Sequence, residues 1–137
     1  MTLPIFEFSL PGPLRDQLVA AVLDGSKTST TGLLRGYEVQ NLPLNEIGSQ
    51  SAVIDSEGRR VAVIEITSVR VVQLGDVDLA HVLDEGEGLT TVAQWRAVHE
   101  QGWHSPAERA ELGDPTFTAN DATPLVLQRF RLVTNMS

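Results

Sequence analysis

The stretch RRVAVIEITSVRVVQL, residues 59–74, does most to decide the fold of this chain. It is rich in valine and isoleucine, as β-strands are, and the preceding QSAVID (residues 50–55) has the same character. The turn residues SEGRR between them predict a β-hairpin with a long second strand. That strand alternates on both sides of Thr67, which indicates a curved sheet of the kind that closes into a barrel.

Helical spacing appears on both sides of the hairpin. LRDQLVAAVLD (residues 14–24) has apolar residues at helical intervals and predicts an amphipathic helix that ends at Gly25. LTTVAQWRAVHEQGW (residues 89–103) predicts a second helix, with Thr90 or Thr91 as its N-cap.

The remaining segments complete an α+β pattern. TPLVLQRFRLVT (residues 123–134) predicts a closing strand. A short helix is expected around residues 32–38, and residues 104–122 are interpreted as a polar connection. The expected architecture is one domain, residues 1–137, built around a barrel-like sheet flanked by helices.

Composition and charge restrict the classes of partner. No apolar run is long enough for a membrane span and no signal peptide is seen, so a cytoplasmic protein is expected. The net charge of -8, with scattered basic residues, argues against tight binding to DNA or another long polyanion. A small nucleoside or single-stranded RNA is compatible with this charge, while the oligomeric state is left open.

The segment DGSKTSTTG, residues 24–32, contains Lys27, the single lysine of a chain that has nine arginines. With no cysteine in the sequence, a hydrolytic nucleophile has to be a hydroxyl group or an activated water. A buried lysine can act as the base because burial lowers its pKa, whereas an arginine stays protonated. From composition alone, such a cluster is more often a solvated turn.

The ordered landmarks resemble the ASCH superfamily of PUA-like β-barrel domains over nearly the whole chain. The residues that carry the resemblance are the G-x-K-T-x-T motif (Gly25, Lys27, Thr28, Thr30), Leu33-Leu34, Tyr37-Glu38, residues 44–48, DEGEG (residues 84–88), Trp95, Arg96, His99 and PLVLQRFRLV (residues 124–133). The resemblance implies a PUA-like β-barrel (ASCH fold) flanked by helices.

The smallest members of this superfamily resemble amidohydrolases that remove the acetyl group from N(4)-acetylcytidine. Carried over by motif, their catalytic residues are Lys27, Thr30 and Glu87, with Glu85 as the alternative because the alignment in DEGEG slips by two. This chain departs from those members in two places: it has extra length at residues 100–122, and it has TTGLL where they have an arginine. RNA-binding modules and ribonucleases are the alternative functions.

The hydrolase hypothesis takes Thr30 as nucleophile, Lys27 as base and Glu87 as proton carrier to the departing amine. The alternative, in which Glu87 only holds the lysine side chain in place, is left open. Residues three apart share a face in a turn or helix but not in a strand, so this mechanism requires a non-extended segment.

Further residues are candidates for binding the substrate. Tyr37 is a candidate for stacking on a base, and His99 is a candidate for lining the cleft. Thr28 is a further candidate, with a hydrogen bond to the backbone of its own turn as its packed role. Arg35 is a candidate for stabilising the phosphorane charge in a ribonuclease. For each of them a packed or solvated role is the alternative. Asp84, Glu85 and Glu87 have the oxygen ligands of a Mg²⁺ site, but acidic turns are more often solvated, so neither a metal nor a cofactor is expected.

Overall fold

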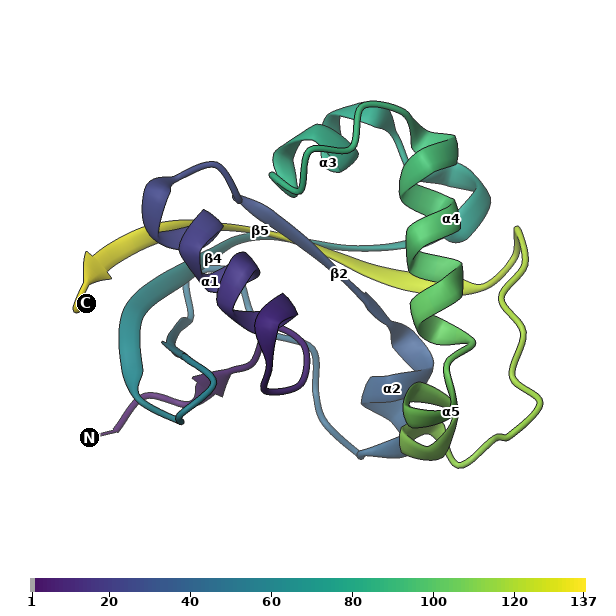
Figure 1. Cartoon of the computed structure of the whole chain (residues 1–137), viewed down its shortest axis with the longest axis horizontal. Coiled ribbons are helices and arrows are strands. Elements are labelled where there is room, and N and C mark those ends of the chain that lie inside the picture. Colours follow the sequence, from purple (N-terminus) through teal and green to yellow (C-terminus); the bar gives the residue numbers. More distant parts are fainter. Residues whose placement is uncertain (1) are drawn as a thin grey trace.

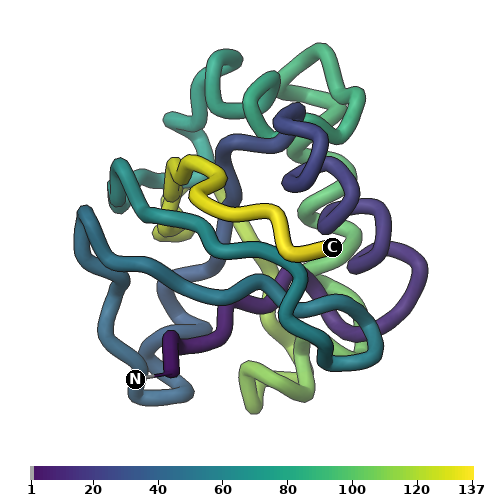
Figure 2. Tube along the Cα trace, turned by 90° about the vertical axis from the view of Figure 1, so that its left-hand side faces the viewer, coloured from purple at the N-terminus to yellow at the C-terminus, as the bar shows by residue number. Residues whose placement is uncertain are grey.

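A five-stranded sheet with the strand order β1-β3-β4-β5-β2 organises the fold (Figure 1). The structure, a computed structural model, describes residues 2–137. The strands are β1 (Ile5–Phe6), β2 (Ser29–Leu33), β3 (Gln50–Ile54), β4 (Arg60–Gln73) and β5 (Pro124–Asn135). β1 joins β3 in parallel, so the N-terminal segment lies against the hairpin (Figure 2), and all the other pairings are antiparallel.

The sheet is bent where β4 pairs with β5. Ile66 lies opposite Phe130 and Ser68 opposite Arg129, which leaves Thr67 as an extra residue in β4. Such a bulge bends the strand and increases its twist. The curvature predicted from the alternation around Thr67 is therefore confirmed, as are the hairpin and the α+β class.

Within residues 2–137, five α-helices and one 3-10 turn connect the strands. They are α1 (Pro13–Asp24), α2 (Leu34–Val39), α3 (Leu79–Asp84), α4 (Val92–Trp103), α5 (Pro106–Leu112) and η1 (Leu74–Asp76). The two long predicted helices correspond to α1 and α4, and Thr91 caps α4 by accepting a bond from Gln94 N. α1 lies over β4 and β5 near one end of the sheet, and α4 with α5 stands near the other end (Figure 1).

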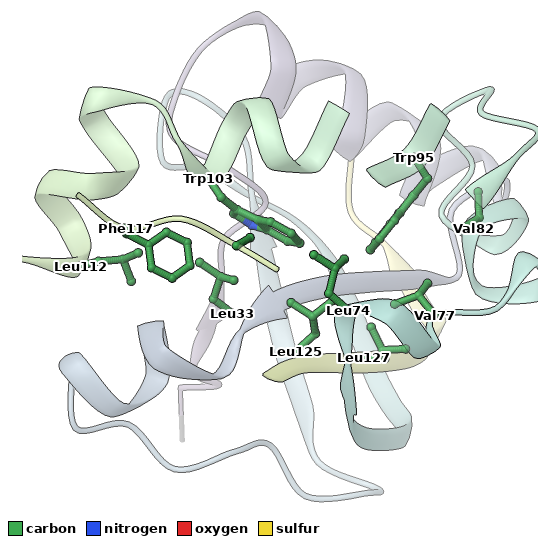
Figure 3. Packing of buried hydrophobic residues seen from close by; sticks show 11 residues of the cluster. Leu33, Leu74, Val77, Val82, Trp95, Trp103, Leu112, Phe117, Leu125 and Leu127 are labelled. Carbon is green, nitrogen blue, oxygen red and sulfur yellow. The ribbon is translucent and has the colours of Figure 1, made fainter. Parts of the chain in front are cut away.

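Two hydrophobic clusters lie on opposite faces of β5. Leu125 and Leu127 point to one face, where Trp95 and Trp103 reach them from α4 (Figure 3). Phe130, whose even number places it on the other face, packs in the cluster that α1 covers. The sheet is thus covered by helices on both sides, and both tryptophans belong to its packing.

The structure differs from the sequence predictions in three segments. Residues 29–33, which the Lys27–Thr30 mechanism requires to be a turn or helical start, are the strand β2. The acidic segment contains α3, which begins after the N-cap Asp78, and the polar connection contains α5, which begins after the N-cap Ser105. These elements are short and depend on their caps and on packing, which periodicity does not report.

None of the helices in residues 2–137 has the length and apolar character required to cross a membrane.

The end of α3 lies directly on the segment that joins α1 to β2. Gly86 has a φ of 68°, and a Cβ added there would lie 2.3 Å from the carbonyl oxygen of Ser26. Gly88 has a φ of 80°, but a Cβ added there would meet no atom within 4 Å. Only Gly86 therefore combines a left-handed backbone with a close approach of two segments.

We expect Gly88→Ala to lower the free energy of unfolding by about 1–2 kcal/mol, the penalty of a left-handed alanine. Gly86→Ala adds the clash with a backbone carbonyl and should lower it by about 1–3 kcal/mol more. Urea unfolding of the two variants beside the wild type measures both values. Equal losses would show that the contact with Ser26 is not tight.

Candidate functional site

The start of β2 is fixed against the C-terminal end of α3 by backbone hydrogen bonds. After Gly25 ends α1 with a φ of 86°, the Lys27 N–H donates to the Ala21 carbonyl at 3.0 Å. The Thr28 N–H then donates to the Asp84 carbonyl at 2.7 Å. This arrangement directs the Lys27 side chain inward, towards the residues that follow α3.

The Lys27 amine is buried, and the whole residue is only 3% exposed. Its Nζ donates to the carbonyl of Ser29 at 2.9 Å and to the carbonyl of Glu85 at 3.3 Å. The Glu85 Oε1 lies 3.8 Å from Nζ, and the ring of Phe8 lies 5.8 Å away on the apolar side. The single lysine therefore forms a buried ion pair whose partner comes from the acidic segment.

The Glu85 carboxylate, in a residue that is 2% exposed, is surrounded by donors. The Thr31 hydroxyl donates to Oε2 at 2.7 Å, and the Trp95 indole N–H donates to the same oxygen at 2.8 Å. His81 Nε2 lies 3.1 Å from Oε2, and His99 Nε2 lies 3.5 Å from Oε1. Four side chains from β2, α3 and α4 therefore converge on one carboxylate.

Burial acts on both members of the ion pair. Burial lowers the pKa of Lys27, while the negative charges of Glu85 and Glu87 oppose that shift. Burial alone would raise the pKa of Glu85, but the bonds to His81 and His99 and the charge of Lys27 hold it well below its usual range. Glu85 is therefore a carboxylate at neutral pH.

Glu87 and His99 lie on the solvent side of this cluster. A carboxylate oxygen of Glu85, one of Glu87 and a ring nitrogen of His99 all lie within 4.8 Å of one another. Partial burial of the carboxyl group and the neighbouring Glu85 carboxylate raise the pKa of Glu87 to about 7. Glu87 is exposed as a residue, so its carboxyl group is within reach of a molecule from solution.

His99 is a neighbour of the two glutamates, and its pKa reflects that position. Burial alone would lower its pKa, but bonding to Glu85 outweighs burial, and its pKa is raised. Its Nδ1 lies 2.9 Å from the Trp95 carbonyl, and its ring stacks on the Trp95 indole with centroids 4.2 Å apart. The structure therefore places His99 against Trp95 and beside the acidic segment, while its role in lining a cleft stays a prediction.

β2 separates the two neighbouring threonines. Because Ser29–Leu33 is extended, side chains alternate between its faces. The non-extended segment that a Lys27–Thr30 pair requires is therefore not present. Thr31 points to the Glu85 face, whereas Thr30 pairs with Gln128 on the other face of the sheet.

Two predicted substrate-binding residues lie outside the cluster. Tyr37 accepts a hydrogen bond at its hydroxyl from Gln128 Nε2 at 2.9 Å, which places it on the Thr30 face. Arg35 pairs with Asp114 at 3.0 Å beside a surface hollow of about 530 Å³. Thr28 contributes a long hydroxyl contact of 3.4 Å to the Asp84 carbonyl, next to the cluster.

The donor set of Glu85, Glu87 and His99 was tested as a metal site. Both Glu85 oxygens already face donors, namely the Thr31 hydroxyl, the Trp95 N–H, Lys27 and two histidines. Oε2 accepts two hydrogen bonds, and Oε1 faces Lys27 and His99, so both oxygens already have polar neighbours within the protein. The set fits an internal hydrogen-bond network better than an ion.

Three members of the network were not identified as functional residues by sequence reasoning. Interpreting STTGL as a strand would have placed Thr30 and Thr31 on opposite faces, so that only one of the two hydroxyls could face the acidic segment. His81 lies four residues before Glu85, which is the spacing of neighbours on a helix. Trp95 was interpreted as core; it is core, and its N–H binds Glu85 as well.

We expect the Glu87 carboxyl group to titrate with a midpoint near pH 7. His99→Gln should move the midpoint higher, because it removes a positive charge that favours the carboxylate. Carbon-13 NMR of the glutamate carboxyl groups over pH 3–9 measures both midpoints. A Glu87 midpoint near 4.5 in the wild type would contradict the geometry described here.

Lys27→Met should lower the free energy of unfolding by about 3–5 kcal/mol, because the buried Glu85 charge loses its partner. Arg59→Met is a matched control, since it removes a cation from an exposed pair with Asp55 and should have little effect. Urea unfolding measures both. A small loss for Lys27→Met would mean that water reaches the pair.

Comparison with known proteins identifies the family of the chain. The sequence profile of the ASCH domain family matches residues 6–134. No curated protein sequence matches the chain.

Solved structures share the fold. An ASCH domain from Lactobacillus crispatus is 24% identical, with a TM-score of 0.81 over 96% of this chain and 79% of that one. A protein from Enterococcus faecalis is 21% identical, with a TM-score of 0.84 over 98% and 78% of the two chains. A ZmASCH mutant protein from Zymomonas mobilis is 9% identical, with a TM-score of 0.51 over 89% and 70%. The family match covers most of the sequence, and the chain belongs to the ASCH domain family.

Proposed function

We propose that this chain hydrolyses the acyl-amide bond of a modified nucleoside such as N(4)-acetylcytidine. The observation that carries the proposal is the pair Glu85 and Glu87, two neighbouring carboxyl groups whose environments separate their pKa values. Glu85 stays ionised, and Glu87, with a pKa of about 7, is poised to give or take a proton at neutral pH. Carboxyl pairs separated in this way are typical of acid–base catalysis.

Thr31 takes the place of Thr30 as the nucleophile in this proposal. Its hydroxyl already donates to Glu85, so a proton acceptor is in place, as hydroxyl nucleophiles require. Thr31 is only half-buried, whereas the Lys27 amine is enclosed. Lys27 therefore acts by holding Glu85, and the groups that meet the substrate are Thr31 and Glu87.

The reaction balances with these groups. Thr31 Oγ attacks the acyl carbon while its proton passes to Glu85. The carbon–nitrogen bond breaks, and the departing amine takes the proton of Glu87. Proton exchange between the two carboxyl groups restores their starting states, and water then cleaves the Thr31 ester to release the carboxylic acid.

The nucleoside substrate class rests on the resemblance to the small amidohydrolases and on the acidic charge balance of the chain. The chain carries a net charge of -8, which disfavours long polyanions more than a neutral nucleoside. The partly exposed His99, stacked on Trp95, adds an aromatic edge beside the carboxyl pair.

Incubation with N(4)-acetylcytidine should release cytidine and acetate, measured by chromatography. Glu87→Gln and Thr31→Ala should each lower kcat by about 100-fold or more. Thr30→Ala is the matched control and should keep most of the activity, because its hydroxyl faces the other side of β2. No release of acetate by the wild type, or equal losses in the two threonine variants, would overturn the proposal.

The rate should fall as the pH rises through about 7, because the amine then leaves without the proton of Glu87. Rates measured between pH 5 and 9 test this. Any activity left in Glu87→Gln should not show this fall in rate as the pH rises. A wild-type rate that rises steadily above pH 7 would remove Glu87 from the acid role.

A further inference from the structure

His81 is a buried histidine with polar partners at only one of its two ring nitrogens. The residue has no exposed surface, and its backbone N–H donates to the N-cap Asp78. Its Nε2 lies 2.7 Å from the Thr31 hydroxyl and 3.1 Å from Glu85 Oε2. Among residues 2–137, its Nδ1 has no hydrogen-bond partner.

The two ring nitrogens differ in whether they can carry a proton. Nε2 faces a carboxylate oxygen, and an unprotonated nitrogen there would set two lone pairs against each other. A proton on Nδ1 would be buried without an acceptor, which is costly. The environment therefore selects the tautomer with the proton on Nε2.

We propose that His81 is a positioning residue, which as the Nε2–H tautomer directs the Thr31 hydroxyl proton onto Glu85. A hydroxyl has one proton to donate. Nε2 lies 2.7 Å from Thr31 Oγ and 3.1 Å from Glu85 Oε2, so the threonine is the nearer acceptor for the His81 N–H, and it donates its own proton to the carboxylate. The chain of bonds then runs in one direction, from His81 through Thr31 to Glu85.

This direction has a chemical consequence for Thr31. The hydroxyl proton lies on the path to its acceptor, and the remaining lone pair of Oγ is free to attack an acyl carbon. The inference rests on the proposed function for its biological meaning. Its chemistry, however, is testable with an acyl donor that contains no nucleoside.

The first test is nitrogen-15 NMR of the histidine rings at pH 8. The expected result for His81 is a protonated Nε2 and an unprotonated Nδ1. A proton on Nδ1 would overturn the inference, because the bond direction through Thr31 would then reverse.

The second test is acylation of the protein by 4-nitrophenyl acetate, followed by intact mass and by peptide fragmentation. Thr31 Oγ forms an ester with the acetyl group, its proton passes to Glu85, and the leaving 4-nitrophenolate carries the negative charge away. In the wild type we expect acetylation at Thr31. Acetylation that avoids Thr31 would overturn the proposal.

Matched variants separate positioning from packing. His81→Met keeps the bulk but has no donor, and should slow Thr31 acetylation by about tenfold or more. His81→Gln places an amide N–H near the position of Nε2 and should recover most of the rate. Thermal unfolding of both variants identifies losses due to misfolding, and equal rates in Met, Gln and wild type would overturn the positioning role.

The assay with N(4)-acetylcytidine keeps the two proposals distinct. If Thr31 is acetylated in a His81-dependent manner but the nucleoside stays intact, the positioning role stands and the substrate class is wrong. If the nucleoside is hydrolysed, His81→Met should lower kcat and leave KM unchanged. Full kcat in that variant would overturn the inference alone.

Discussion

The buried pair of Lys27 and Glu85 is the interaction on which the rest of the site depends. Removing two charges from water is expensive unless hydrogen bonds satisfy both partners. Here the amine donates to two carbonyls, and the carboxylate accepts from a hydroxyl and an indole N–H. The pair also joins the α1–β2 connection to the end of α3, so the same contact that completes the packing assembles the candidate site.

The sequence allowed the main framework to be predicted because the long elements carry strong periodic signals. β4, β5, α1 and α4 all have their predicted type, and the curvature at Thr67 was indicated by the alternation on both sides of it. Lys27 and the acidic segment were also recognised as partners, through the family resemblance. These features are local in sequence or stand in a fixed order along it.

The conformation of β2 could not be predicted in the same way. STTGL has the serine, threonine and glycine content of a turn, but pairing with β5, almost a hundred residues later, makes it extended. Because side chains alternate along an extended strand, the hydroxyl of Thr31, and not that of the preceding Thr30, contacts Glu85.

The other face of β2 carries a separate polar group. There Gln128 bonds both Tyr37 and Asn45 and ties the loop after α2 to the sheet.

The hydrogen bond between the Lys27 amine and the Ser29 carbonyl also bears on how the protein resists aggregation through its edge strand. β2 is an outer strand of the sheet, and the Thr28 carbonyl accepts from Phe130 N on β5, so the next carbonyl, that of Ser29, points away from the sheet. Unpaired carbonyls on an outer strand invite strands of other molecules to add to the sheet. The Lys27 amine bonds the Ser29 carbonyl, and a buried cation at that position makes the β2 edge of the sheet a poor template for aggregation.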